Sequence, residues 1–348
     1  MRAWRLPIKD RWCVGIDLHK DTLFVVAFDP RSGEVIERRL ACKCRAKIVE
    51  FFRSLGRPNL VALEAVGFYR WLWELLEPVV DRLVLADATQ CRARAGRRIK
   101  TDAEDAANVM ELLMAGRLPL AWAPPTPVAA LRDLTRHRNY LSRQHARVLH
   151  RVKSIMLLVN RPGPARLRAP GLMRYLKAQR DKLPAHLAEQ LEMAVDELVL
   201  LERQLDRMEQ RLKAHLKQPG FAAVAECLES FPGVSTVIAA TVLAEVGDFR
   251  RFGDRDAISR YAGLNPRLFS SGETTRTGRI AKAGSRDLRW ALVQAAWVAV
   301  RCDPAVRRLW LRLRKRLGGK RAIVAVARRM LRWMWSASRH GQLYQPAA

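Results

Sequence analysis

The sequence predicts an α/β domain at residues 10–124, a long helical coiled-coil connector at 125–220 and a mainly helical unit at 221–348. Short apolar segments alternate with helical stretches at the start of the chain, which is typical of an α/β sheet. Two long segments then carry apolar residues at spacings of three and four, which indicates helices that pack in pairs. From residue 221 onward the pattern is that of short helices separated by glycine-rich turns. The predicted fold class is therefore α/β followed by all-α.

Apolar segments predict the elements of the first domain. Residues 12–29, WCVGIDLHKDTLFVVAFD, contain two apolar stretches around a polar turn, which predicts a β-hairpin. Residues 59–67 and 82–89 are short apolar strands, and the segment 69–80 between them has a helical pattern. Residues 118–128 hold four prolines and cannot continue a helix, so the domain boundary is expected there.

The connector is predicted to contain two long helices, at residues 131–159 and 187–212. The second segment repeats apolar residues over about four heptads. Such spacing suits a helix pair within one chain and a coiled coil between chains equally well, so both interpretations stay open. The loop 160–171, NRPGPARLRAPG, is basic and rich in Pro and Gly, and it separates the two helices.

The charge of the chain indicates a polyanionic partner. The formal net charge is +29, with 63 basic against 34 acidic residues, and about fifty of the basic residues are Arg. Arg suits bidentate contact with phosphate, so nucleic acid is the expected partner. No apolar run is long enough to span a membrane, and a cytoplasmic location is expected. The six Cys residues lack metal-binding spacing and are expected to be reduced.

Four carboxylates predict a metal site within this basic chain. Asp17 interrupts an apolar strand, and Glu64 ends another. Asp102 and Asp105 are three residues apart, so on a helix they share one face. A carboxylate in a core strand is costly unless it is compensated, and Mg²⁺ prefers such oxygen ligands. The alternative for Asp102 and Asp105 is that they only place negative charge at the N-terminus of a helix, where it stabilises the helix dipole. Glu104 does not share their face, and it is expected to have only that role.

These acids lie in segments that resemble a known family. The segments GIDLHKDTLFVVAFD, ALEAVGFYRWLWELL and KTDAEDAANV are similar, in order and spacing, to the ribonuclease H-like (RuvC-like) domain of DEDD-type insertion-sequence transposases. The four acids of that family's pattern correspond to Asp17, Glu64, Asp102 and Asp105. The resemblance implies that these four side chains are catalytic and bind Mg²⁺.

Residues 228–252 predict a helix-hairpin-helix in the C-terminal unit. The turn of such a motif offers backbone N–H groups at a helix start to a phosphate. Ser235 stands where this turn usually has its second glycine.

A serine in the C-terminal unit is the predicted nucleophile. Residues 261–296 resemble the transposase domain of the same family, whose pattern is YAGL-x-P, then SG, then G-x-I-x-K-x-G-x-x-x-LR. The serine that matches this pattern is Ser271. Its neighbour Ser270 does not align with the serine position of the pattern. Five basic residues near it are predicted to bind nucleic acid through phosphate contacts: Arg276, Arg279, Lys282, Arg286 and Arg289.

The resemblance also implies a reaction and its partners. Ser271 would attack a DNA phosphodiester and form a covalent phosphoserine intermediate. The partners would be double-stranded donor and target DNA and a guide non-coding RNA. Members of the family assemble as homodimers and homotetramers, in which the acids of one protomer complete the site around the serine of another. The protein would act at the bacterial nucleoid.

Two other functions remain open from the residues alone. A RuvC-like hydrolytic nuclease acting on branched DNA would need the four acids but not Ser271. A non-catalytic nucleic-acid-binding protein would tolerate the loss of all five residues. The Trp residues of the basic C-terminal helices, Trp310, Trp333 and Trp335, would either stack on unpaired bases or pack in the core.

Overall fold

The computed structural model describes residues 8–95, 101–161, 169–179, 182–271, 274–281 and 284–345. The chain forms two compact units, Met1–Ala123 and Pro124–Ala348. The first unit is mixed α/β and the second is largely helical. The further division of the second unit at residue 220 stays a prediction.

A six-stranded sheet forms the centre of the first unit, with the strand order β3-β2-β1-β4-β5-β6. The strands are β1 (Trp12–Leu18), β2 (Thr22–Asp29), β3 (Glu34–Ala41), β4 (Asn59–Glu64), β5 (Arg82–Ala86) and β6 (Leu120–Ala121). The predicted hairpin is confirmed, because β1 pairs antiparallel with β2. On its other side β1 pairs in parallel with β4. Strand β3 was not predicted, because this edge strand is mostly exposed and lacks apolar alternation.

Helices cover both faces of this sheet, and the alternation of side chains along the strands decides which face each residue joins. Helices α1 (Arg45–Ser54) and α2 (Arg70–Leu76) pack on the face that carries Val14, Ile16 and Leu63. Helix α4 (Asp102–Met114) packs on the opposite face, which carries Cys13, Leu60 and Ala62. Helix α3 (Ala88–Ala95) follows β5.

Helix α4 lies directly against β1 at Gly15. A Cβ atom built on this glycine would lie 2.2 Å from the carbonyl oxygen of Ala106 and 2.6 Å from the amide nitrogen of Met110. Both atoms belong to the helix backbone, which cannot rotate away as a side chain can. Only glycine therefore lets α4 lie this close to the strand.

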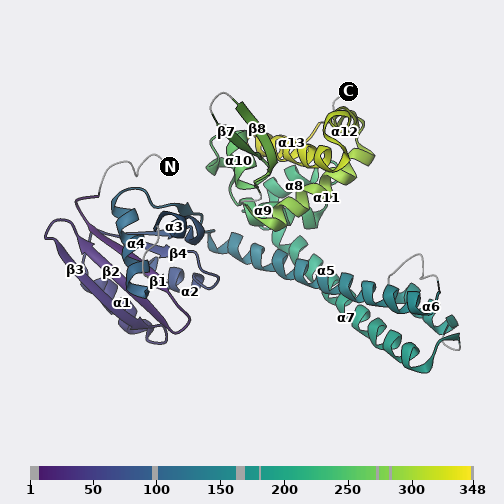
Figure 1. Cartoon of the computed structure of the whole chain (residues 1–348), viewed down its shortest axis with the longest axis horizontal. Coiled ribbons are helices and arrows are strands. Elements are labelled where there is room, and N and C mark those ends of the chain that lie inside the picture. Colours follow the sequence, from purple (N-terminus) through teal and green to yellow (C-terminus); the bar gives the residue numbers. More distant parts are fainter. Residues whose placement is uncertain are drawn as a thin grey trace. The chain divides into compact units, whose positions relative to one another are not determined.

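The second unit begins with two long helices that lie side by side, as Figure 1 shows. Helices α5 (Thr126–Leu158) and α7 (Ala185–Leu216) are linked through α6 (Ala169–Gln179). Their apolar side chains, including Leu141, Val152, Leu191 and Leu198, form one buried cluster. The heptad pattern thus serves packing within the chain. The connecting loop 160–171 lies largely outside the described residues.

Helices α8 to α13 surround the largest buried cluster among the described residues. They are α8 (Ala222–Glu229), α9 (Thr236–Val246), α10 (Arg255–Tyr261), α11 (Arg286–Cys302), α12 (Pro304–Leu317) and α13 (Gly319–His340). The prediction of short helices was wrong for α11 and α13. A hairpin of β7 (Pro266–Ser271) and β8 (Thr274–Ile280) was also missed, since its polar, basic sequence gives little apolar alternation. Trp310, Trp333 and Trp335 pack against the core, as the second of the two interpretations expected.

Among the helices that the structure describes, none has the length and apolar character needed to cross a bilayer.

The contact at Gly15 gives a prediction for stability. Gly15→Ala places a methyl group against the backbone of α4, so we expect the free energy of unfolding to fall by about 1–3 kcal/mol. Urea denaturation of the purified protein measures this change. Gly67→Ala is the matched control, because a Cβ there meets nothing within 4 Å and the glycine does not need a left-handed backbone. Equal stability of the two variants would contradict the proposed contact.

Candidate active site

Two parallel strands carry the first two predicted acids to the same edge of the sheet. Ile16 of β1 pairs with Leu63 of β4, and Asp17 and Glu64 are the next residues along. Both side chains point to the face that α4 covers, by alternation from Cys13 and Leu60. The two residues are only 6% and 7% exposed, respectively. Two carboxylates are thus buried side by side at the ends of neighbouring strands.

The start of α4 supplies the other two acids. The side chain of Thr101 caps this helix by accepting a hydrogen bond from the amide of Glu104 at 3.2 Å. Asp102 and Asp105 then lie in the first turn, and both are partly buried, whereas Glu104 is exposed. One turn later Ala106 and Met110 make the close contact with Gly15, two residues before Asp17. The contact at Gly15 therefore brings the first turn of α4 toward Asp17.

His19 joins two of the acids. Its Nε2 atom lies 2.9 Å from Oδ2 of Asp17 and 3.3 Å from Oδ1 of Asp102. Each of these three residues offers one donor atom, and the three atoms lie within 4.8 Å of one another. His19 was not predicted. The available signal was its position two residues after Asp17, beyond the end of the same strand.

The electrostatics show that the acids act on one another. The pKa of Glu64 is raised to about 7, mainly by burial and then by the negative charge of Asp17, with a smaller contribution from Asp105, while the positive charge of Arg92 opposes the shift. Burial also raises the pKa of Asp17, His19 opposes this, and the charges of Asp105 and Asp102 add to it. All four carboxylates therefore lie within electrostatic reach of one site.

Three of the four acids line a cavity of about 380 Å³. Asp17, Glu64 and Asp105 line it together with His19. The remaining lining residues are Leu18, Lys20, Val66, Phe68, Arg92 and Asn108. The cavity thus combines carboxylates with cationic side chains on Lys20 and Arg92.

The donor set fits a divalent cation. Buried carboxylates whose pKa is raised by burial and by neighbouring negative charges favour a positive charge beside them, because it removes the repulsion and the desolvation cost. Carboxylate oxygens are hard ligands of the kind that Mg²⁺ takes. Among the described residues, Asp17, His19 and Asp102 have ligand atoms close enough together to hold such an ion, and Glu64 and Asp105 line the cavity beside them.

The predicted nucleophile lies in the second unit. Ser271 is the last residue of β7, and it pairs with Thr274 of β8 across the hairpin. The side chains of Ser270, Ser271, Arg276 and Arg279, and the whole of Lys282, lie outside what the structure describes. Their predicted roles therefore stay predictions.

The two remaining basic residues are on α11 and differ in their surroundings. Arg286 is exposed at the start of the helix. Arg289 donates from Nη1 to the carbonyl oxygens of Ala262 and Gly284, at 3.2 and 2.7 Å. Gly284 itself lies against the backbone of Tyr261, because a Cβ atom built on Gly284 would lie 1.9 Å from the carbonyl oxygen of Tyr261. Arg289 is thus already used, at least in part, to hold the segment before α11.

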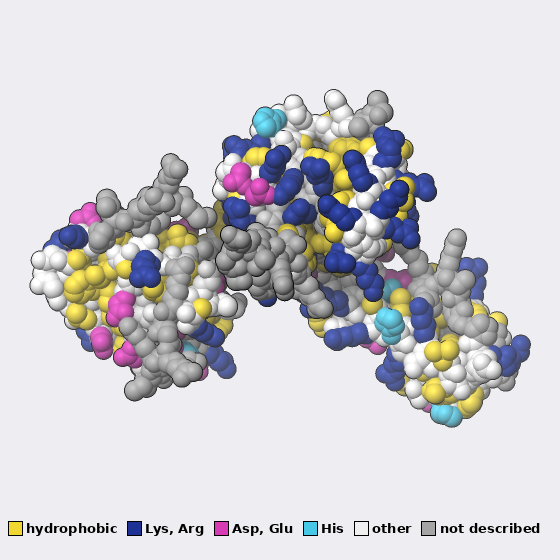
Figure 2. Space-filling model, turned by 45° about the horizontal axis from the view of Figure 1, so that its top comes forward, with side chains coloured by type: hydrophobic (Ala, Val, Ile, Leu, Met, Phe, Trp, Pro, Cys, Tyr) yellow, Lys and Arg dark blue, Asp and Glu magenta, His cyan; other side chains and the backbone are white. Residues whose placement is uncertain are grey.

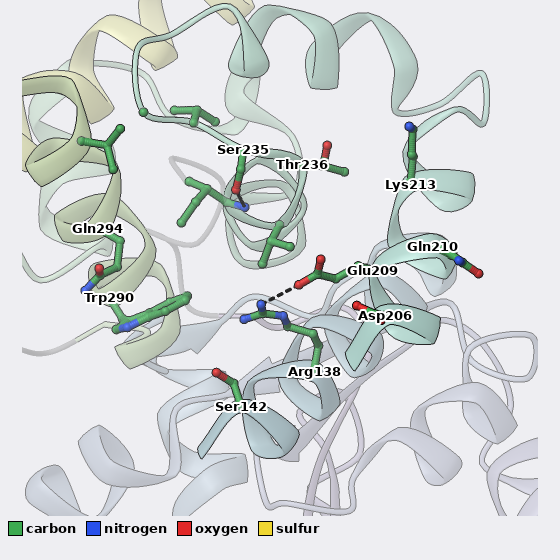
Figure 3. Close-up of a pocket in the computed structure, with 15 residues that line it drawn as sticks. Arg138, Ser142, Asp206, Glu209, Gln210, Lys213, Ser235, Thr236, Trp290 and Gln294 are labelled. Atoms are coloured by element: carbon green, nitrogen blue, oxygen red, sulfur yellow. Dashed lines mark hydrogen bonds and ion pairs between the residues drawn. The ribbon is translucent and has the colours of Figure 1, made fainter. Parts of the chain in front are cut away.

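The predicted helix-hairpin-helix corresponds to α8, the turn 230–235 and α9. Gly233 in this turn has a φ of +81° and packs directly on α11, and Ser235 caps α9. Figure 3 shows the turn on one side of a cavity of about 1030 Å³, with Trp290 and Gln294 on α11 beside it. Across the cavity Arg138 bonds to Glu209 at 2.7 Å. The cavity carries both charge signs, and Lys213 and Asp206 also line it.

Comparison with known proteins identifies the family. Residues 14–160 match a family model described as "Transposase", and residues 225–311 match one described as "Transposase IS116/IS110/IS902 family". A protein of Pseudomonas aeruginosa named "Probable family 20 transposase" is 30% identical over 96% of this chain and 98% of its own length. The chain belongs to the IS116/IS110/IS902 family of transposases. The "Transposase for insertion sequence element IS1111A" of Coxiella burnetii is 25% identical over 99% of this chain and 94% of its own length.

This transposase is thus an enzyme of a class that cleaves and recombines DNA. The first matched segment contains Asp17, Glu64, Asp102 and Asp105, and the second contains Ser271 and the α8–α9 turn. The predicted membership of an insertion-sequence transposase family is confirmed.

The raised pKa of Glu64 predicts how the stability of the metal-free transposase depends on pH. Between pH 4.5, which is the ordinary pKa of this carboxyl, and about pH 7, which is its pKa in the folded chain, folded Glu64 keeps a proton that the unfolded chain has lost. The free energy of unfolding therefore falls as pH rises through this window, by up to about 3 kcal/mol at roughly 1.4 kcal/mol per pKa unit. Chemical denaturation in chelator at pH 5 and pH 8 measures it. Glu64→Gln should flatten the dependence, and an unchanged slope would contradict this assignment.

Proposed function

We propose that this transposase moves its DNA element by Mg²⁺-dependent attack of Ser271 on a DNA phosphodiester, which gives a covalent phosphoserine intermediate. The observation that carries the proposal is the convergence of four carboxylates at the ends of β1 and β4 and the start of α4. It is supported by the match of both segments to transposase models.

The first unit is proposed to have the ribonuclease H-like (RuvC-like) fold. The support is the strand order β3-β2-β1-β4-β5, in which β2 alone runs antiparallel to the other four strands. Asp17 and Glu64 are fixed by the sheet, and Asp102 and Asp105 are fixed by α4. When Mg²⁺ is bound by these acids, it supplies positive charge that binds the scissile phosphate and stabilises the leaving oxygen.

Ser271 is proposed to make the new bond. Its hydroxyl oxygen bonds to phosphorus while the bond from phosphorus to the DNA oxygen breaks, and the serine proton passes to that leaving oxygen, so the energy of the phosphodiester is kept in the serine ester. A DNA hydroxyl then attacks this ester, which joins the strands and releases the serine oxygen as a hydroxyl. Arg276, Arg279, Lys282 and Arg286 are proposed to hold the phosphates around it. The acids of one protomer and the serine of another would form one site within a homodimer or homotetramer.

A guide non-coding RNA is proposed to choose the donor and target DNA. Residues 304–340, which form α12 and α13, carry many Arg and Lys residues and no Asp or Glu. Figure 2 shows Lys and Arg side chains gathered over this C-terminal part of the chain. Such a surface follows a phosphate backbone without reading sequence, so the specificity would come from DNA shape or from base pairing, and we propose base pairing to a guide as the source. The α8–α9 turn is a further proposed phosphate contact. The complex would act at the bacterial nucleoid.

The acids give the first test of this function. Asp105→Asn removes one charge from the site but no element of the fold, so we expect strand cleavage in Mg²⁺ to fall at least about 100-fold. DNA binding should change little. Glu104→Gln is the control, because Glu104 is an exposed acid of the same helix turn. Normal cleavage by Asp105→Asn would refute the metal site.

The serine gives the second test. Ser271→Ala should abolish both recombination and the covalent protein–DNA species that survives denaturation, because no hydroxyl remains to bond phosphorus. Gel electrophoresis under denaturing conditions detects that species. Ser270→Ala is the adjacent control and should behave as the wild type. If Ser271→Ala still cut DNA at the normal rate, a hydrolytic nuclease would be the better description.

The guide gives the third test. Protein expressed with its native flanking DNA should co-purify with a discrete RNA, and ribonuclease treatment of the complex should abolish site-specific recombination. Sequencing of the bound RNA and a recombination assay measure the two outcomes. Full activity of the RNA-free protein would reject guidance and leave the metal and serine assignments standing.

A further inference from the structure

Phe68 is an aromatic side chain that the active-site chemistry described above does not use. It is 46% exposed, and it lines the same cavity as Asp17, Glu64 and Asp105. Single apolar side chains on a protein surface are common. Phe68 differs from them because it lines a cavity together with carboxylate and cationic side chains.

The turn after β4 explains why the ring of Phe68 lies in the cavity and not in the core. The amide of Val66 donates to the carbonyl oxygen of Glu64 at 2.8 Å, and the amide of Tyr69 donates to that of Val66 at 3.2 Å. This tight turn sends the adjacent aromatic residues in different directions. Tyr69 packs edge-on against Trp73 of α2, with ring centroids 6.4 Å apart, and joins the core of the sheet. Phe68 is left in the cavity, four residues after Glu64.

The surroundings of Phe68 select a ligand with two properties. The acids, with a cation between them, and the side chains of Lys20 and Arg92 favour a phosphate. Leu18 and Val66 line the cavity as well, so it also has an apolar wall. A nucleotide offers a phosphate and a flat apolar base face together. A base in an intact duplex has its faces covered by its neighbours, so only an unpaired base can use the ring.

We propose that Phe68 stacks on an unpaired DNA base next to the scissile phosphate, so that the acidic cavity takes a strand that is locally opened rather than an intact duplex. This rests on the proposed function, in which the acids bind the DNA phosphate. Phe68 is thus a positioning residue. Stacking on its ring holds the opened strand and sets the adjacent phosphate against Asp17, Glu64 and Asp105.

The test measures binding to two DNA probes, with Ca²⁺ in place of Mg²⁺. One is a fully paired duplex, and the other is the same duplex with a short central mismatched bubble that holds the fluorescent base 2-aminopurine. The wild type should prefer the bubble and quench the fluorescent base by stacking. Phe68→Ala should lose about tenfold in affinity for the bubble and lose the quenching, with the paired duplex unaffected. Phe68→Tyr should restore both properties, which a merely structural defect would not allow.

Tyr140→Ala is the matched control, because Tyr140 is an aromatic residue of similar exposure, 54%, that does not line this cavity. It should bind and quench as the wild type does. Retention of both the bubble preference and the quenching by Phe68→Ala would overturn the proposal. If that occurred while Asp105→Asn still failed to cut DNA, only the stacking role would fall. Normal cutting by Asp105→Asn would instead remove the proposed function itself.

Discussion

The contact between helix α4 and strand β1 at Gly15 is the constraint on which the candidate site depends. The helix backbone lies where any side chain at this position would be, with the Ala106 oxygen 2.2 Å from a Cβ. The first turn of α4, with Asp102 and Asp105, is therefore set toward Asp17, and the parallel pairing of β1 with β4 sets Glu64 beside it. One glycine thus links the packing of the sheet to the positions of all four acids.

The resulting site answers a problem that the composition raises. A chain of net charge +29 binds polyanions readily, yet phosphate chemistry needs negative ligands for a metal ion. The four acids are grouped in the first unit, where burial and mutual repulsion raise the pKa values of Asp17 and Glu64. The acid-free helices α12 and α13 are in the second unit. The two charge requirements are thus met in different parts of the chain.

Sequence patterns predicted the elements that apolar segments or apolar periodicity mark. The hairpin of β1 and β2 and strands β4 and β5 were predicted from short apolar segments, and the helix pair α5 and α7 from apolar residues at spacings of three and four. Asp17 and Glu64 stood out because they interrupt such patterns. His19 and Phe68 were not predicted. Only the tertiary fold brings Asp102 of α4 beside His19 and places Phe68, in the turn after β4, in one cavity with the acids. The hairpin of β7 and β8 was missed because polar strands leave no apolar signal.

Binding of Mn²⁺ to the purified transposase tests the central claim most directly. If the four acids form one site set by the α4–β1 contact, Mn²⁺ should raise the midpoint of thermal unfolding, because it binds the folded chain preferentially. Asp17→Asn should lose this rise, and Gly15→Ala should reduce it, although Gly15 has no metal-binding atom in its side chain. Glu104→Gln should keep the full rise. An equal rise in all four proteins would contradict the account.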